Sequence, residues 1–76
     1  MKKDLETYIR TPKDISKKSL KDQSEILTLA FIGMIAIPIG ISEELLRKCN
    51  KAFNNNRGQF ELEAEAILKV LKEKHA

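Results

Sequence analysis

The longest apolar stretch of the chain covers residues 26–37, where ten of twelve side chains are apolar. Ser19 precedes it and is a helix-capping residue, because its hydroxyl accepts a bond from a free backbone N–H of the first turn. Pro38 and Gly40 follow it, and both residue types end helices. The pattern therefore predicts a first helix over about residues 20–37.

Two amphipathic patterns follow this stretch. Ser42 is a second capping residue, and after it apolar side chains recur three or four residues apart, as on one face of a helix. The turn 54–58 separates it from a third pattern. The apolar face of that pattern consists of Phe60, Ala64, Ile67, Leu68 and Leu71. No stretch alternates with the period of two that is typical of a strand. We expect helices over about residues 43–54 and 59–75, and an all-α fold, a small bundle of three main helices.

Charge divides the chain into two parts. Residues 1–21 contain seven basic and three acidic side chains, a local excess of +4, whereas the whole chain carries +3. We expect residues 1–18 to form a basic, partly ordered N-terminal arm or short helix, and residues 19–76 to form a single helical domain. Such an arm attracts nucleic acid or an acidic protein surface, or it is simply a solvated segment that maintains solubility.

The residue types that catalysis and metal binding need are nearly absent. Cys49 is the one cysteine and His75 the one histidine. The chain therefore has no internal disulfide and lacks the residues for a zinc site or a Ser-His-Asp triad. Phosphate-binding glycine loops and the EF-hand spacing are missing as well. We expect a binding protein rather than an enzyme, with no catalytic residue, metal or cofactor.

A helix that is apolar on every side must be surrounded on every side. Two amphipathic helices would cover only part of the predicted first helix, so we expect a second copy of the chain to cover the rest in a homodimer. The contact with that copy, or with another protein, would come from Leu29, Phe31, Ile32, Met34 and Ile35. The alternative is that the N-terminal arm folds back over the helix through Leu5, Tyr8, Ile9 and Ile15.

The segment 35–49 resembles the helix-turn-helix motif of bacterial regulators. The matching positions, from the small residue of the first helix to the apolar residues of the second, are Ala36, Gly40, Ile41, Ser42, Leu46 and Cys49. The resemblance implies a DNA-binding regulator in which the second helix presents its basic side chains to the nucleic acid. Together with the arm, the candidate nucleic-acid contacts are Lys17, Lys18, Arg47, Lys48 and Lys51. The order of elements is also similar to that of small dimeric helical regulators linked to biofilm formation and acid stress.

A membrane role is the remaining alternative. Residues 26–41 carry no charge, but Pro38 and Gly40 interrupt the run before it reaches the about 20 apolar residues of a spanning helix. The leading residues contain acids, unlike a secretory signal. We therefore expect a cytoplasmic, non-enzymatic helical homodimer that binds another macromolecule as a regulator, adaptor or inhibitor. DNA-binding regulation and membrane association are the alternatives.

Overall fold

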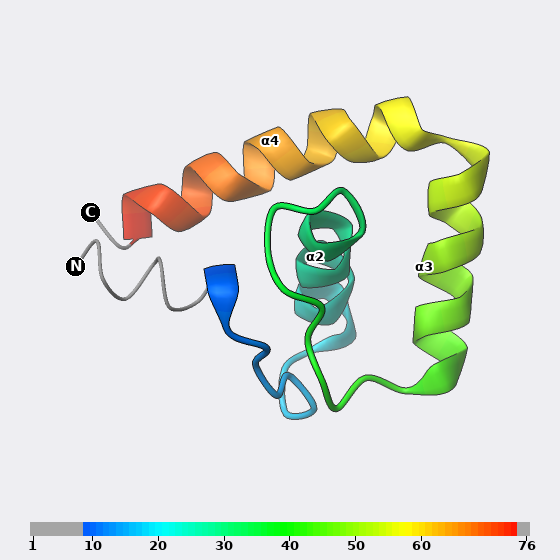
Figure 1. Ribbon diagram of the computed structural model, residues 1–76. Helices are drawn as coiled ribbons and strands as arrows, with labels where there is room; N and C mark the ends of the chain where they lie inside the picture. Colours follow the sequence, from blue (N-terminus) through cyan, green and yellow to red (C-terminus); the bar gives the residue numbers. More distant parts are fainter. Residues whose placement is uncertain (1–8, 75–76) are drawn as a thin grey trace.

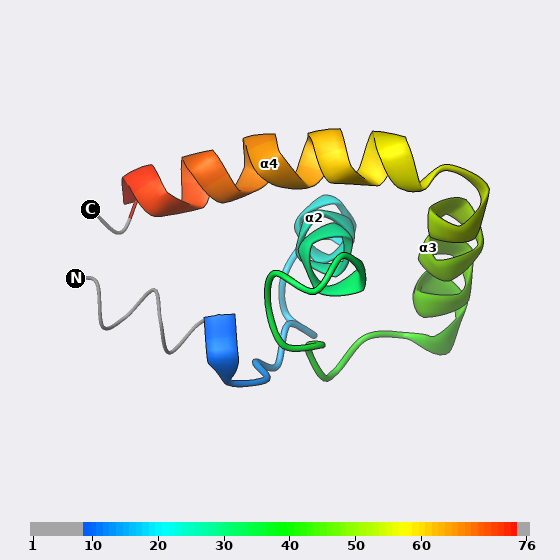
Figure 2. The ribbon, with the colours of Figure 1, turned by 45° about the horizontal axis from the view of Figure 1, so that its top comes forward.

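The computed structural model describes residues 9–74, and within this range the chain forms three full helices, helical backbone at Ile9 and Arg10, and no strand (Figure 1). Helix α2 spans Leu20–Phe31, α3 spans Glu43–Asn55 and α4 spans Arg57–Lys74. The predicted all-α fold is confirmed. Helix α4 passes across one side of α2, and α3 stands at an angle to both, as the two ribbon views agree (Figures 1 and 2). Helix α2 therefore occupies the middle of the fold.

The first helix ends at Phe31 and not near residue 37, so this part of the prediction was wrong. Gly33 adopts a φ of +82°, the left-handed backbone that favours glycine. Its N–H donates to the carbonyl of Ala30 and the N–H of Met34 donates to the carbonyl of Leu29, both at 3.0 Å. These two bonds satisfy the last free carbonyls of the helix, and together with the glycine they form a Schellman cap. The apolar run thus turns at Gly33, well before the proline.

Residues 32–42 form an extended connection between α2 and α3, and this connection runs beside residues 9–15 (Figure 1). The N–H of Ile15 donates to the carbonyl of Ile39 at 3.0 Å, and the N–H of Ile39 donates to the carbonyl of Lys13 at 2.9 Å. A third bond runs from the N–H of Ala36 to the carbonyl of Ile9 at 2.7 Å. The described part of the predicted arm is therefore tied to the body by backbone hydrogen bonds.

The side chains of this pairing enter the core. Ile15 is completely buried, and Ile9 is partly buried against the central cluster. Ile9 therefore packs against the apolar stretch, as the alternative with a folded-back arm predicts, and Ile15 is buried beside the connection. Leu5 and Tyr8 lie outside the described residues.

The core lies where α4 crosses α2. Leu29 and Ala30 from α2 meet Ala64 from α4, and Ile35 from the connection closes the cluster. Ala64 has no exposed surface, and its small side chain lets the two helices approach closely. Partly buried residues of α4 complete the packing, namely Ile67, Leu68 and Leu71. The predicted apolar face of the third helix thus packs against α2.

Three aromatic rings join the helices at the corner between α2, α3 and α4. The rings of Phe31 and Phe53 are stacked at 5.6 Å between centroids, and Phe60 meets Phe53 edge-on at 5.4 Å. The guanidinium of Arg57 lies 5.0 Å from the centre of the Phe53 ring, within the range of a cation–π contact. One ring from each helix therefore fixes the angle at which α3 leaves the other two.

Capping side chains place the starts of the helices. The hydroxyls of Ser19 and Ser42 accept bonds from the N–H groups of Asp22 and Leu45, as predicted for α2 and α3. Helix α4 begins two residues earlier than the predicted start near residue 59, because the side chain of Asn56 accepts a bond from the N–H of Gln59 at 3.1 Å. The loop between α3 and α4 is thereby reduced to Asn56 alone.

Candidate functional site

An open groove of about 320 Å³ lies between α2 and the C-terminal half of α4. Its apolar lining consists of Ile26 from α2 and of Ala66, Ile67, Val70 and Leu71 from α4. Its charged lining consists of Lys18, Asp22, Glu25 and Lys74. An apolar groove with charges of both signs at its edge is suited to an amphipathic protein surface, since the centre excludes water and the charges orient the partner.

Helix α4 carries apolar side chains on a second face as well. Leu62 is 67% exposed and Val70 is 51% exposed, and Ala66 lies exposed one turn from each. Sequence reasoning described only the face of α4 that packs on α2 and missed this one. The signal was present, because residues 62, 66 and 70 recur at intervals of four on the side of the helix opposite Ala64.

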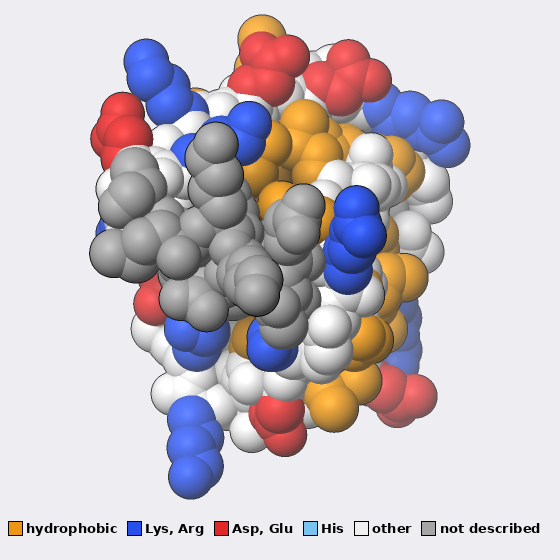
Figure 3. All heavy atoms as spheres, turned by 60° about the vertical axis from the view of Figure 1, so that its left-hand side comes forward, with side chains coloured by type: hydrophobic (Ala, Val, Ile, Leu, Met, Phe, Trp, Pro, Cys, Tyr) orange, Lys and Arg blue, Asp and Glu red, His pale blue; other side chains and the backbone are white. Residues whose placement is uncertain are grey.

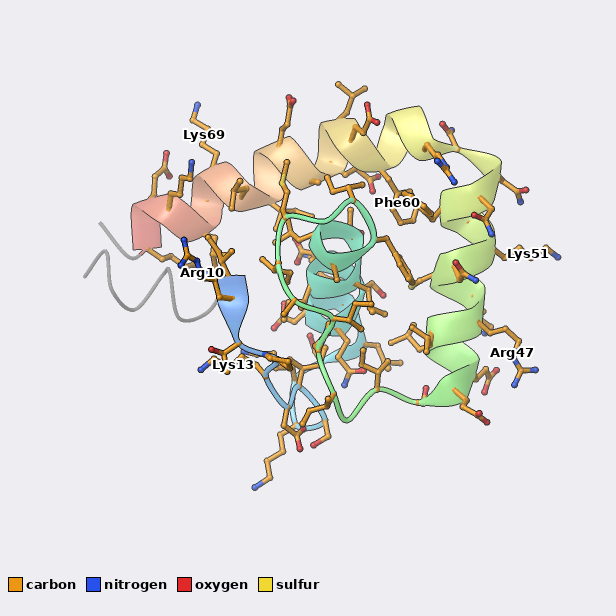
Figure 4. The ribbon with its side chains drawn as sticks, in the orientation of Figure 1. Arg10, Lys13, Arg47, Lys51, Phe60 and Lys69 are labelled. Atoms are coloured by element: carbon orange, nitrogen blue, oxygen red, sulfur yellow. The ribbon has the colours of Figure 1, made fainter. Side chains whose placement is uncertain are left out.

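The outer face of α3 is basic and polar. Arg47 and Lys51 point away from the body of the molecule (Figure 4), while the amine of Lys48 lies 3.4 Å from the carboxylate of Glu44. This ion pair is exposed and contributes about 0.3–0.5 kcal/mol at most. A second hollow, of about 420 Å³, separates α3 from the connection. Its lining is Phe31, Ile37, Glu43, Leu46, Arg47 and Asn50.

The structure places the predicted interface residues mostly inside the chain. Leu29 is 1% exposed and Ile35 is 7% exposed, and both belong to the core cluster. Ile32 and Met34 are partly buried against that cluster, and Phe31 stacks on Phe53. The reason is that α2 ends early and the connection folds back over it. Leu29 and Ile35 are therefore covered by the same chain and the other three are covered in part, whereas Ile37 and Ile39 of the connection stay 60% and 57% exposed.

The structure does not bring the predicted nucleic-acid contacts into one cluster. Lys17 and Lys18 are exposed in the turn before α2, and Lys18 lines the groove between α2 and α4. Arg47 lines the hollow beside α3 instead. The basic residues therefore belong to two different surfaces.

The helix-turn-helix geometry is present only in its second half. Ala36 lies in the extended connection, so the helix expected at this position is not formed. Gly40 has the expected left-handed turn, with a φ of +80°, and Ser42 caps α3. Leu46, expected in the core, is 37% exposed. The long connection separates two helices that the motif would join by a tight turn.

The carboxyl of Asp14 has a lowered pKa. Its carboxylate accepts hydrogen bonds from the side chain and the backbone N–H of Ser16, the latter at 2.8 Å, and these bonds hold its pKa below the ordinary value. Both residues lie beside Gly40 in the turn that begins the pairing of arm and connection. The lowered pKa of Asp14 therefore results from the hydrogen bonds that hold this turn together.

Comparison with protein-family models, curated proteins and solved structures finds no match for this chain. Its candidate site therefore stands on its own geometry. Within residues 9–74, no group of three or more His, Cys, Asp and Glu side chains is placed to hold a metal ion. Among the described helices, none combines the length and hydropathy that crossing a membrane requires. Cys49 is partly exposed on α3.

The surface of the molecule mixes apolar and charged patches. Figure 3 shows apolar side chains reaching the outside as bands between Lys and Arg side chains, with acidic groups at the edges of the same face. Figure 4 shows that Lys69 projects outward from α4 whereas Phe60 points inward towards the aromatic corner. The two sides of α4 thus differ in character, and its outer side is a candidate contact surface together with the groove.

Proposed function

We propose that this chain is a non-enzymatic binding protein that regulates, links or inhibits another macromolecule through the groove between α2 and α4. The observation that carries the proposal is the groove itself, whose apolar lining is bordered by Lys18 and Lys74 on one hand and by Asp22 and Glu25 on the other. Self-association into a homodimer, a protein partner and a cytoplasmic location belong to the same proposal.

The energetics of the exposed side chains support a contact surface here. Burying a Leu or Val side chain completely is worth about 1.5–3 kcal/mol, and Leu62 and Val70 each leave more than half of their surface in water. A small domain has only about 5–15 kcal/mol of stability in total. A partner that covers these side chains therefore gains a substantial free energy of binding.

Site-specific photo-crosslinking tests this proposal. A photoreactive amino acid at Val70, in the groove, is expected to capture one partner in cells, and the same amino acid at Lys51, on α3, is not. The captured protein is then purified and its affinity measured. We expect Val70→Lys to weaken the affinity at least tenfold and Lys51→Glu to leave it within a factor of two. Equal capture from both positions, or an affinity insensitive to Val70→Lys, contradicts the proposal.

A second candidate function is nucleic-acid binding through α3. The observation in its favour is that Arg47 and Lys51 project into solvent from one side of α3, with Asn50 on the same helix (Figure 4). Arginine and asparagine side chains read base edges, and lysine contacts phosphate. Double-stranded DNA binding would weaken steeply with salt, because each phosphate contact releases counterions. Under this function Arg47→Glu abolishes binding while Lys72→Glu, on α4, changes it little. Equal losses from the two variants exclude specific use of α3.

A further inference from the structure

The outer face of α4 is complementary to itself when two copies run in opposite directions. We propose that a second copy of the chain occupies this surface. Two α4 helices then pair antiparallel around Ala66, and Leu62 of each copy lies at the groove edge of the other. This inference rests on the proposed function, since it names the first partner of a surface that adjoins the same groove and shares Ala66 and Val70 with it.

The geometry of α4 supplies the apolar part of this contact. A helix turns by about 100° per residue, so Ala66, two residues beyond the buried Ala64, lies about 200° around the helix from the contact with α2, at the edge of the groove. Leu62 and Val70 lie one turn to either side of Ala66. The small side chain at the centre lets two helix axes approach to about 8–10 Å. In an antiparallel pair centred there, Leu62 comes to lie over Val70 of the other copy, where the groove opens.

The charges of α4 favour the antiparallel direction. On one flank of the stripe Glu65 precedes Lys69, and on the other Glu63 precedes Lys74. In an antiparallel pair each flank faces the same flank of the second copy in reverse, so Glu65 lies within about one turn of Lys69 of the other copy, and the two Glu65 side chains also approach each other at the centre. A parallel pair would place acids against acids and bases against bases, which is unfavourable. The distribution therefore favours an antiparallel pair of copies over a parallel one.

Two polar residues also lie on this face, at the ends of the stripe. Glu73 is seven residues beyond Ala66 and Gln59 is seven residues before it. Antiparallel pairing around Ala66 brings the carboxylate of one copy to the amide of the other. The amide of Gln59 already donates to Glu63 within its own helix at 3.2 Å, and its second N–H is available for Glu73.

Measurement of mass in solution is the first test. The untagged chain, followed by light scattering over a range of concentrations, is expected to reach twice the 8.7 kDa mass of the chain. Leu62→Lys is expected to raise the dissociation constant of the dimer at least tenfold. Leu20→Lys, a matched change of a leucine that is 69% exposed on α2, is expected to leave the dissociation constant unchanged. A monomer at every concentration, or equal effects of the two variants, overturns the inference.

A second test exchanges charges on α4 and replaces no apolar side chain. All the altered residues are exposed, so the fold of the single chain should be preserved. Glu63→Lys with Glu65→Lys gives one variant, and Lys69→Glu with Lys74→Glu gives the other. Each variant alone is expected to be monomeric where the natural chain is dimeric, and an equal mixture is expected to recover the dimer mass. Dimers that persist in each variant alone contradict the proposed interface.

Cysteine crosslinking determines the direction. In a Cys49→Ser background, Leu62→Cys mixed with Val70→Cys is expected to form a disulfide between copies faster than either variant forms one with itself. The opposite order of rates, in which like positions link faster, overturns the antiparallel arrangement. The photoreactive amino acid at Val70 distinguishes a failure of this inference from a failure of the proposed function. If it captures only a foreign protein and the chain is monomeric, the inference fails and the binding function stands.

Discussion

Gly33 and Gly40 have the same backbone conformation but different surroundings. Both adopt a positive φ, near +80°, which costs a residue with a side chain about 1–2 kcal/mol. Nothing lies within 4 Å of the place where a Cβ on Gly33 would stand. A Cβ on Gly40 would meet the carboxylate of Asp14 and the side chain of Ser16. The two glycines therefore separate the cost of the backbone conformation from the cost of crowding.

Replacement of each glycine by alanine tests this distinction. Gly33→Ala is expected to lower the free energy of unfolding by about 1–2 kcal/mol, the backbone term alone. Gly40→Ala is expected to lower it further, because overpacking is added. Urea denaturation followed by circular dichroism measures both values. Equal losses would show that the turn around Asp14 adjusts without cost.

The Asp14 turn gives a second prediction at this scale. The hydrogen bonds from Ser16 hold the pKa of Asp14 below its ordinary value, so they stabilise the fold above the pKa of the unfolded carboxyl, and this contribution is lost as the pH falls through the folded pKa. Ser16→Ala removes the side-chain bond and retains the backbone bond. We expect the pKa of Asp14, followed by NMR titration of its carboxyl carbon, to rise in this variant. Lys17→Ala, next in the same turn, is the control, and an equal rise there would assign the displaced pKa to another cause.

The helices differ in what holds them in place. Helix α2 is surrounded by the connection, the arm and α4, and it contains most of the buried residues. Helix α3 has no buried residue and is joined to the others by Phe53, which contacts Phe31 and Phe60. Helix α4 packs on α2 through Ala64 and starts at the Asn56 cap. The position of the outer face of α4 therefore depends on that cap and on the crossing at Ala64.

Asn56 is expected to contribute measurably to stability through the start of α4. Asn56→Ala removes the side-chain acceptor of the Gln59 N–H and should lower the free energy of unfolding by about 1 kcal/mol. Asn54→Ala is the matched control in the last turn of α3, where alanine is the better helix former, and we expect no loss there. Urea unfolding measures both variants. A loss at position 54 as large as that at 56 would refute the capping role.

At the scale of the whole molecule, the described N-terminal residues are part of the core. Ile15 is fully buried, and its backbone pairs with Ile39 of the connection. This pairing covers apolar side chains that the sequence pattern assigned to a contact with a second copy. Apolar side chains remain exposed on the outer side of α4, at Leu62 and Val70, and also at Leu20 on α2 and at Ile37 and Ile39 on the connection.

The stability of the molecule should therefore depend on Ile15. Ile15→Ala is expected to lower the free energy of unfolding by about 2–5 kcal/mol, the usual cost of truncating a buried isoleucine. Leu20→Ala, at a side chain 69% exposed, should change it by about 0.5 kcal/mol or less. Chemical denaturation gives both values. A cost at Ile15 no greater than that at Leu20 would mean that residues 9–15 do not belong to the cooperative unit.

Local patterns in the sequence were sufficient for the fold class and most helix starts. Ser19 and Ser42 cap α2 and α3 as predicted, because a capping hydroxyl acts within three residues of its own position. The apolar face of α4 was also correct, since helical periodicity determines which residues share a face. These features involve neighbours along the chain and need no knowledge of distant contacts.

Only the tertiary structure decided which apolar side chains remain exposed. Residues 32–37 have the composition of a buried helix, but Gly33 turns the backbone and the connection gains hydrogen bonds from residues 9–15. Leu29 and Ile35 are thereby buried within the chain, and Leu62 and Val70 stay in water. A long-range pairing of backbone groups between residues 9–15 and the connection has no periodic signal in the sequence. The candidate contact surface could therefore be recognised only after the arm and the connection had been placed.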